Sequence, residues 1–287
     1  MEPEAYLHQK KERLEKALRQ YLYASDNPVF AAMRYAVLSG GKRFRPLLLL
    51  SCGEYFGGRE ELLMSYACAV EFVHNYSLIH DDLPAMDNDD FRRGQPTCHR
   101  KFGEALALLA GDGLLTLAFQ VLAEAPAPGE NPVLKDLFIK ELAAAAGPAG
   151  MIEGQWLDIS FQPEHKNQEN YQEIAFKKTA GLIMAAAVGG ARLAGATASG
   201  LEAIKKYSYN LGLAFQLWDD LEDLDSDHKV AEPERPNLAF FLGKQKASEK
   251  LLELQAAAVN ALRTCGIQSP VLEYFVRMLQ PKTGARP

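Results

Sequence analysis

The chain has 287 residues, of which 48% are hydrophobic and 24% are charged, and its formal net charge is −6. These fractions are typical of a folded globular protein and exclude a disordered or collagen-like chain. The negative net charge argues against a nucleic-acid-binding protein, because such proteins draw their affinity from a basic surface. An anionic substrate stays compatible with it, since a few clustered lysines and arginines dominate the local field.

The N-terminus, residues 1–22, mixes charges and lacks the apolar core of a secretory signal. The longest apolar stretch, residues 181–195, contains Arg192 and is shorter than the about 18–20 residues that span a bilayer. We therefore expect a soluble protein with no transmembrane segment. Four cysteines lie far apart with no metal-ligand spacing, and we expect reduced thiols in a cytoplasmic protein: Cys52, Cys68, Cys98 and Cys265.

Apolar residues recur at helical spacing from the start of the chain, as in Leu14, Leu18 and Leu22. Strand-like alternation of Val, Ile and Thr is almost absent, whereas Pro and Gly separate the helical segments. Ordinary helix lengths predict roughly ten to twelve helices. Because no internal repeat and no long linker divides the chain, we expect one all-α domain over residues 1–287.

The first motif in chain order is GGKRFRP at residues 40–46. A Gly-Gly turn carrying Lys42, Arg43 and Arg45, followed by the apolar residues 47–50, is a plausible cradle for an anion. The alternative interpretation is a set of ordinary surface cations.

The second motif is the acidic run DDLPAMDNDD at residues 81–90, followed by FRRG. A helix is predicted over residues 61–82, and Pro84 should end it near Asp82. Carboxylates at a helix C-terminus face the negative end of the helix dipole, and a bound cation would offset this unfavourable interaction. Clustered carboxylates without histidine ligands are the oxygen donors that magnesium prefers. A solvated acidic loop is the alternative.

A second acidic motif, QLWDDLED, covers residues 216–223 and follows the apolar residues 211–215. On a helix, Gln216, Asp219 or Asp220, and Asp223 share one face. One such motif is compatible with an exposed helical face, but two acidic clusters that each end an apolar helix weaken that interpretation. Acidic clusters beside a basic set are the arrangement expected around bound magnesium and a diphosphate.

His74 lies seven residues before Asp81, two turns away on the same helical face. Together with the pair His80-Asp81, it is also compatible with a helical metal-dependent phosphohydrolase. That interpretation leaves the second acidic motif and GGKRFRP unexplained.

The chain resembles the trans-isoprenyl diphosphate synthases from about Phe30 to about Gly243, with the short-chain bacterial farnesyl diphosphate synthases most similar. Four strings carry the resemblance, in the family's order: GGKRFRP, EFVHNYSLIHDDLPAMDNDDFRRGQPT, KKTAGL and FQLWDDLED. Those synthases also have two extra residues in the first acidic motif, here around Pro84-Ala85. The resemblance implies a single helical bundle of the isoprenoid synthase type around a central apolar cavity, three Mg²⁺ ions with substrate bound, and a homodimer.

The resemblance also implies roles for individual residues. Residues expected to hold the diphosphate of isopentenyl diphosphate are Lys42, Arg45, His74 and Arg93. Residues expected to bind magnesium directly are Asp81, Asp87 and Asp219, while those expected to act through water or hydrogen bonds are Asp82, Asp220 and Asp223. Arg92 and Lys178 are expected on the allylic diphosphate, and Lys178, Thr179 and Gln216 make up the expected catalytic group.

The implied activity is condensation of isopentenyl diphosphate with dimethylallyl or geranyl diphosphate. Farnesyl diphosphate is the expected product, with geranyl and geranylgeranyl diphosphate as alternatives. In the family an aromatic residue at the position of Tyr76, beside Ser77, closes the floor of the chain channel. The alternative is that Tyr76 is a core aromatic residue.

One segment departs from the family pattern. The usual Gly-Lys-Xaa-Xaa-Gly-Xaa-Asp and a later Lys are missing from residues 224–237, where Arg235 stands near the position of that Lys. This change affects the expected cap over the diphosphate, unless it is loop variation. Two further functions stay open, a class I terpene synthase and a non-catalytic partner subunit. The isopentenyl-side cations argue against the first, and both acidic motifs argue against the second.

Overall fold

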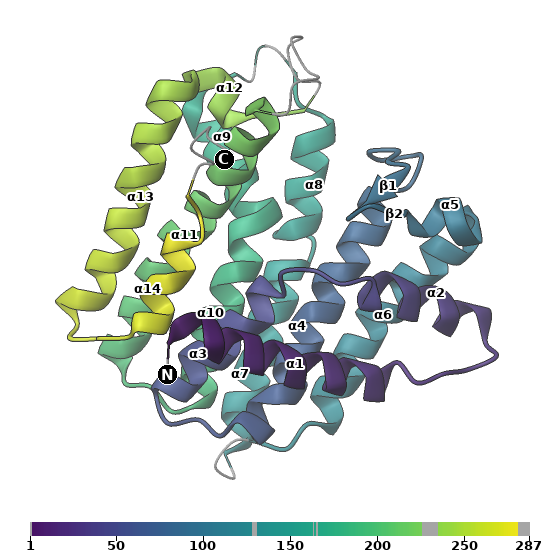
Figure 1. Cartoon of the computed structure of the whole chain (residues 1–287), viewed down its shortest axis with the longest axis horizontal. Coiled ribbons are helices and arrows are strands. Elements are labelled where there is room, and N and C mark those ends of the chain that lie inside the picture. Colours follow the sequence, from purple (N-terminus) through teal and green to yellow (C-terminus); the bar gives the residue numbers. More distant parts are fainter. Residues whose placement is uncertain (1, 128–130, 163, 165, 226–234, 281–287) are drawn as a thin grey trace.

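The computed structural model describes residues 2–127, 131–162, 164, 166–225 and 235–280. These residues form fourteen α-helices, one π-helical turn and one short hairpin (Figure 1). In chain order the elements are α1 (Pro3–Tyr21), α2 (Pro28–Leu38), α3 (Phe44–Tyr55), α4 (Glu60–Asp81), β1 (Phe91–Arg92), β2 (Gln95–Pro96), α5 (Cys98–Phe102), α6 (Glu104–Glu124), α7 (Pro132–Ala146), α8 (Met151–Ile159), α9 (Gln168–Ala175), η3 (Phe176–Ala180), α10 (Gly181–Leu193), α11 (Ala198–Asp225), α12 (Leu238–Leu242), α13 (Lys244–Thr264) and α14 (Pro270–Arg277).

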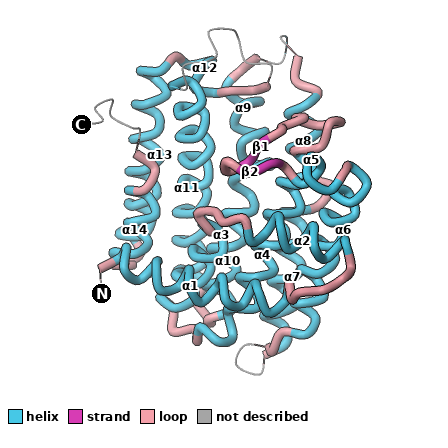
Figure 2. Tube along the Cα trace, turned by 45° about the vertical axis from the view of Figure 1, so that its right-hand side comes forward, coloured by secondary structure: helices cyan, strands magenta, loops and turns pink. Residues whose placement is uncertain are grey.

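The predicted all-α class is confirmed, because the antiparallel pair β1–β2 is the only sheet in the described part of the chain (Figure 2). The helix count exceeds the predicted ten to twelve. Two of the additional helices, α5 and α12, have five residues each, and helices that short show no periodicity in a sequence. The end predicted for the 61–82 helix is confirmed, since α4 ends at Asp81 and Asp82 is its C-cap.

Prolines that separate helical segments in the sequence stand at helix starts in the fold. Pro28 and Pro132 each occupy the first turn of a helix, where the missing N–H costs nothing. The residues before them, Asn27 and Asn131, accept hydrogen bonds from Val29 N and Val133 N through their side chains. These caps satisfy N–H groups that have no partner inside the helix.

Helices α3 and α10 pack against each other in the middle of the bundle. Both contribute to two separate hydrophobic clusters. Leu49 and Leu50 belong to the cluster formed with α1, α2, α4, α6 and α7. Leu47 and Leu48 belong to the cluster formed with α11, α13 and α14. This arrangement leaves the polar ends of α4 and α11 on the two sides of one cavity, described below.

Two helical segments of the described residues, Glu104–Glu124 and Gln168–Leu193, are long and apolar enough to cross a membrane. The sequence-based expectation considered residues 181–195 alone and overlooked α6. The second segment is 72% buried in the fold, whereas α6 is 39% buried. Such matches are weak indications of a membrane span, because core helices of soluble proteins share this length and composition. The absence of a transmembrane segment stays a prediction.

Candidate active site

A cavity of about 1330 Å³ lies between the C-terminal end of α4, α8, η3 and the second half of α11. Its wall also has apolar parts, including Phe44, Met151 and Phe215, so the expected apolar character applies to part of the lining. Of the residues predicted to bind substrate, to bind magnesium directly or to act in catalysis, all but one line this cavity: Lys42, Arg45, His74, Asp81, Asp87, Arg92, Arg93, Lys178, Thr179, Gln216 and Asp219. Of the three aspartates expected to act through water or hydrogen bonds, Asp220 and Asp223 line it and Asp82 does not. The fold thus brings together motifs that are far apart in the sequence, while the individual roles stay predictions.

The exception is Tyr76. Its ring is buried, its hydroxyl donates to the carbonyl oxygen of Ala146 on α7 at 3.4 Å, and it makes an edge-to-face contact with His80. The neighbouring Ser77 lines the cavity instead. The ring of Tyr76 therefore lies between α4, which carries it, and α7. Its role in product length stays a prediction.

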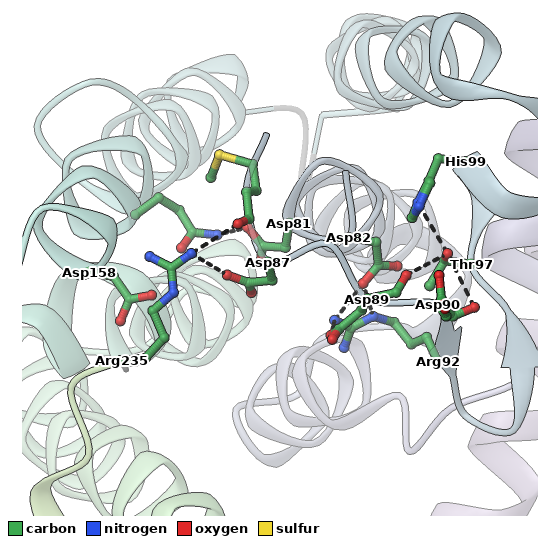
Figure 3. Close-up of polar contacts among 12 residues, drawn as sticks. Asp81, Asp82, Asp87, Asp89, Asp90, Arg92, Thr97, His99, Asp158 and Arg235 are labelled. Atoms are coloured by element: carbon green, nitrogen blue, oxygen red, sulfur yellow. Dashed lines mark hydrogen bonds and ion pairs between the residues drawn. The ribbon is translucent and has the colours of Figure 1, made fainter. Parts of the chain in front are cut away.

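The first acidic motif curls back on itself after α4. Asp87 N donates to the carbonyl oxygen of Asp81 at 2.9 Å, and Asn88 adopts a left-handed backbone with φ of +53°. This turn brings the side chains of Asp81 and Asp87 to the same cavity (Figure 3). Arg235 pairs with Asp87, with 2.9 Å between Nη2 and Oδ1, and Gln155 of α8 donates a hydrogen bond to Asp81.

Burial raises the pKa of Asp81 to about 7, and the nearby charges of Asp87 and Asp158 add to the shift. Lys178 and Arg92 act in the opposite direction. Concentrating carboxylates in a poorly solvated space costs free energy unless a cation offsets their charge. Asp81 is therefore held in a position where a bound cation would be favoured.

The second acidic motif faces the cavity from α11. Burial, followed by the charge of Asp223, raises the pKa of Asp219. Asp220 is engaged differently: its oxygens accept hydrogen bonds from Gln216 Nε2 at 2.9 Å and from the backbone N–H of Leu238 at 2.8 Å. Asp220 thus ties α11 to the start of α12, and its role at the substrate stays a prediction.

The donor set fits magnesium, although no three His, Cys, Asp or Glu side chains in the described residues are grouped closely enough to hold a metal alone. Asp81 and Asp87 approach from one wall and Asp219 from the other. Magnesium is commonly held by one or two carboxylates together with water and substrate phosphates. The two walls therefore fit a cation that a diphosphate helps to bind.

Three cations of the cavity are paired with carboxylates. Arg92 Nε donates to Asp82 Oδ1 at 2.6 Å (Figure 3). Lys178 Nζ lies 2.7 Å from Asp158 Oδ2, and Arg235 pairs with Asp87 as described above. These three pairs surround the acidic motifs with positive charge. Next to Lys178, the hydroxyl of Thr179 donates to Gln216 Oε1 at 2.7 Å.

The position of Lys178 depends on a close approach between helices. A Cβ atom added to Gly154 of α8 would lie 2.4 Å from the backbone nitrogen of Lys178, within the π-helical turn η3. On the other side, a Cβ on Gly212 of α11 would lie 2.5 Å from Ala180 Cβ. The two glycines let α8 and α11 close on this turn. They therefore set where Lys178 and Thr179 enter the cavity.

The GGKRFRP loop forms the opposite side of the cavity. Gly41 has φ of +142°, and a Cβ there would lie 2.8 Å from the guanidinium of Arg93, which donates to the carbonyl oxygen of Gly40. Arg43 points away from the cavity centre into the core, where it pairs with Glu71 at 2.6 Å and with Glu15 at 2.7 Å. This anchoring leaves Lys42 and Arg45 on the cavity wall.

Burial disfavours the charged forms of both Arg45 and His74. Burial lowers the pKa of Arg45 to about 10, and its Nε has no hydrogen-bond partner among the described residues. Desolvation, followed by the charges of Arg45 and Arg93, holds the pKa of His74 well below its usual value. A bound anion would relieve both effects.

Gln155 and Asp158 contact Asp81 and Lys178 and were not among the residues predicted from the sequence. Both lie on α8, and their spacing of three residues places them on one face of the helix. This pair of polar residues in GQWLD was the available signal. It was weaker than the acidic runs because neither residue has a charged neighbour.

Comparison with known proteins agrees with this geometry. The sequence profile of the polyprenyl synthetase family matches residues 27–234. The chain belongs to this family. It is 38% identical to the farnesyl diphosphate synthase of Geobacillus stearothermophilus over 96% of both chains, and 42% identical to that of Escherichia coli (strain K12) over 85% of both. An apo FPP/GFPP synthase from Zymomonas mobilis superposes with a TM-score of 0.88 at 31% identity, covering 96% of this chain and 98% of the other.

Proposed function

We propose that this polyprenyl synthetase condenses isopentenyl diphosphate with dimethylallyl or geranyl diphosphate to give farnesyl diphosphate. The observation that carries the proposal is that the cavity holds two different cation sets. Lys178, Arg92 and Arg235 are bound to carboxylates beside the acidic motifs. Lys42 and Arg45 lie on the GGKRFRP side of the cavity. Two sets suit two diphosphates, one bound with metal and one without.

In the proposed reaction, the bond between C1 and oxygen of the allylic diphosphate breaks, and the electron pair leaves with the diphosphate. Lys178 and Arg92 stabilise the negative charge that develops on this group. The double bond of isopentenyl diphosphate forms the new carbon–carbon bond with the allylic cation, and a proton then passes to the released diphosphate. The hydrogen-bonded pair Thr179 and Gln216 would flank the reacting carbons.

Magnesium belongs to the proposal. Asp81, Asp87 and Asp219 would hold it, and Asp82, Asp220 and Asp223 would act through water or hydrogen bonds. The bound ions, three with substrate present, would neutralise the diphosphate and make it a better leaving group. The carboxylate walls and the raised pKa of Asp81 support this assignment.

The contacts of His80 bear on the phosphohydrolase alternative. His80 Nε2 lies 3.1 Å from the carbonyl oxygen of Leu108, and its ring fills the space beside Gly111 on α6. Since this imidazole packs against α6, it does not share a metal site with His74. This geometry favours the prenyltransferase.

A homodimer is also part of the proposal, following the resemblance. On α6, Leu108 and Leu109 are 48% and 50% exposed, and the helix as a whole is apolar. An apolar face of this kind suits contact with a second copy of the chain. Light scattering of the purified protein would test it: a dimeric mass that Leu109→Glu converts to a monomeric one supports the proposal, and a monomeric wild type contradicts it.

The free cysteines in the described residues suit the proposed cytoplasmic location.

The main experiment is incubation of the purified protein with Mg²⁺, isopentenyl diphosphate and each allylic primer, followed by product identification. Farnesyl diphosphate is the expected product, and geranyl or geranylgeranyl diphosphate would correct the chain length. Cyclised hydrocarbon from an allylic substrate alone would identify a terpene synthase. No product from any combination would indicate a non-catalytic partner subunit.

A further inference from the structure

Lys42, on the GGKRFRP side of the cavity, lies over an aromatic ring. Its Nζ is 4.1 Å from the centre of the Trp218 ring, on α11. Trp218 is 7% exposed, and its Nε1 donates to the carbonyl oxygen of Gln280 at 3.0 Å. The ring is therefore fixed by packing and by a hydrogen bond, and it offers a face to the ammonium group.

The second cation on this side has a similar neighbour. The guanidinium carbon of Arg45 lies 5.8 Å from the centre of the Phe215 ring. Phe215 in turn contacts Trp218, with 5.9 Å between ring centres, and Phe44 at 4.9 Å. Phe215 and Trp218 thus form one aromatic surface beneath both cations, and we call this pair the aromatic platform.

The platform contrasts with the partners of the other cavity cations. Arg92, Lys178 and Arg235 each contact a carboxylate. No ion pair within the described residues involves Lys42 or Arg45, and the charge of Asp219 acts on both without such a contact. A carboxylate partner would neutralise the cation and compete with an incoming anion. A ring face attracts a cation through its quadrupole and carries no net charge. It can hold a cation in place while leaving its charge available.

We propose that Trp218 is a positioning residue for the diphosphate that binds without metal: its ring holds the Lys42 ammonium at the cavity wall without a carboxylate in direct contact. The identity of that ligand as isopentenyl diphosphate rests on the proposed function. The position of Lys42 over Trp218 does not depend on the proposed function. The competing explanation is that Trp218 only fills the core.

The test uses inorganic diphosphate as the probe, with the full-length protein in EDTA, so that magnesium bound at the proposed ligand Asp219, next to Trp218, does not enter the measurement. Isothermal titration compares wild type, Trp218→Leu, Lys42→Ala and the double variant. We expect Trp218→Leu to weaken binding about two- to fivefold, the range for a cation–ring contact at an exposed lysine. In the Lys42→Ala background the same substitution should have no effect.

Trp218→Phe is the matched control, because it keeps a ring face and loses the hydrogen bond to Gln280. Its affinity should lie between those of wild type and Trp218→Leu, since indole binds cations best. Proton NMR of lysine-labelled protein gives a second measurement: the ε-methylene signal of Lys42 should be shifted upfield by the indole ring, and Trp218→Leu should remove the shift. This signal does not depend on core packing elsewhere.

Three results would overturn the inference: no diphosphate binding by wild type in EDTA, equal or tighter binding by Trp218→Leu, or an equal effect of Trp218→Leu with and without Lys42. Tighter binding would mean that the ring withdraws Lys42 from the ligand. The proposed function is judged separately. If the titrations show coupling but no prenyl product forms with Mg²⁺, the reaction assignment fails and the role of Trp218 stands.

Discussion

Arg235 and Asp87 form an ion pair on the cavity wall, with 2.9 Å between Nη2 and Oδ1, and Arg235 also donates to the carbonyl oxygen of Met86 at 3.1 Å. The pair joins the segment after α11 to the loop after α4. Residues 226–234 of the altered segment lie outside the described residues. Arg235 itself lines the cavity, which favours a role at the diphosphate over simple loop variation.

Replacing Arg235 with Ala should raise the apparent KM for the allylic substrate about tenfold, because a charged hydrogen bond to phosphate would be lost. The KM for isopentenyl diphosphate should change little. Steady-state kinetics with each substrate varied in turn measures both constants. Arg235→Lys keeps the positive charge but not the fork of donors. Its apparent KM for the allylic substrate should therefore lie between those of wild type and Arg235→Ala. Unchanged constants for both substrates would leave the segment as loop variation.

Asp81→Ala and Asp219→Ala should each reduce turnover by at least about 100-fold, since each removes one wall of the proposed metal site. Far-UV circular dichroism should show the wild-type helix content for both variants, because both side chains lie at the cavity wall. Product formation at saturating Mg²⁺ is the measurement. Near-normal rates in either variant would show that its carboxylate is not a magnesium ligand.

Tyr76→Ala should yield products longer than fifteen carbons. Removing the ring would open the space between α4 and α7, where its hydroxyl meets Ala146 O. Chromatography of the dephosphorylated products gives the chain lengths, and Tyr76→Phe is the control because it keeps the ring. An unchanged product in Tyr76→Ala would identify Tyr76 as a core aromatic residue.

Gly154→Ala should lower kcat about tenfold to 100-fold, because its Cβ would displace the backbone of Lys178 and misplace the ammonium group. Gly189→Ala on α10 is the matched control, since its Cβ would meet the ring of Phe138 in the core. The control should lose about 1–3 kcal/mol in free energy of unfolding and retain its kcat. Equal kcat in Gly154→Ala and wild type would refute the role of the close approach.

His74 gives a pH dependence of stability. It stays neutral in the fold because its pKa is held well below 6.5, whereas the unfolded chain takes up a proton near that value. The free energy of unfolding should therefore fall as the pH drops below 6.5, by up to about 1.4 kcal/mol per pH unit more in wild type than in His74→Gln. Urea titrations between pH 5 and 7 measure the difference. His8→Gln, at an exposed site, should follow wild type; parallel curves for wild type and His74→Gln would contradict the prediction.

The sequence predicted the end of α4 and the acidic and basic motifs because these depend on local chemistry, whereas the full set of site residues came from the resemblance. Pro84 limits the helix, and runs of carboxylates or cations are visible without knowledge of the fold. The orientation of Arg43 was not predictable in this way. It lies between Lys42 and Arg45 in one motif, and only the packing of α1 and α4 turns it into the core toward Glu15 and Glu71.

Other features depended on contacts between distant segments. Gly154 and Gly212 approach the π-helical turn at Lys178 from two other helices, and no local pattern reveals this contact. The burial of Tyr76 outside the cavity depends on α7 and on His80.

Helices α3 and α10 supply neighbouring residues to both hydrophobic clusters, as Leu47 and Leu48 do to one and Leu49 and Leu50 to the other. Neither half of the bundle can lose its core without exposing apolar side chains of these two helices. Unfolding should therefore be cooperative across the whole domain, with the slowest amide hydrogen exchange in α3 and α10. A nascent chain would assemble neither cluster fully until α10 has been synthesised, and the cavity walls would meet only after α11 follows.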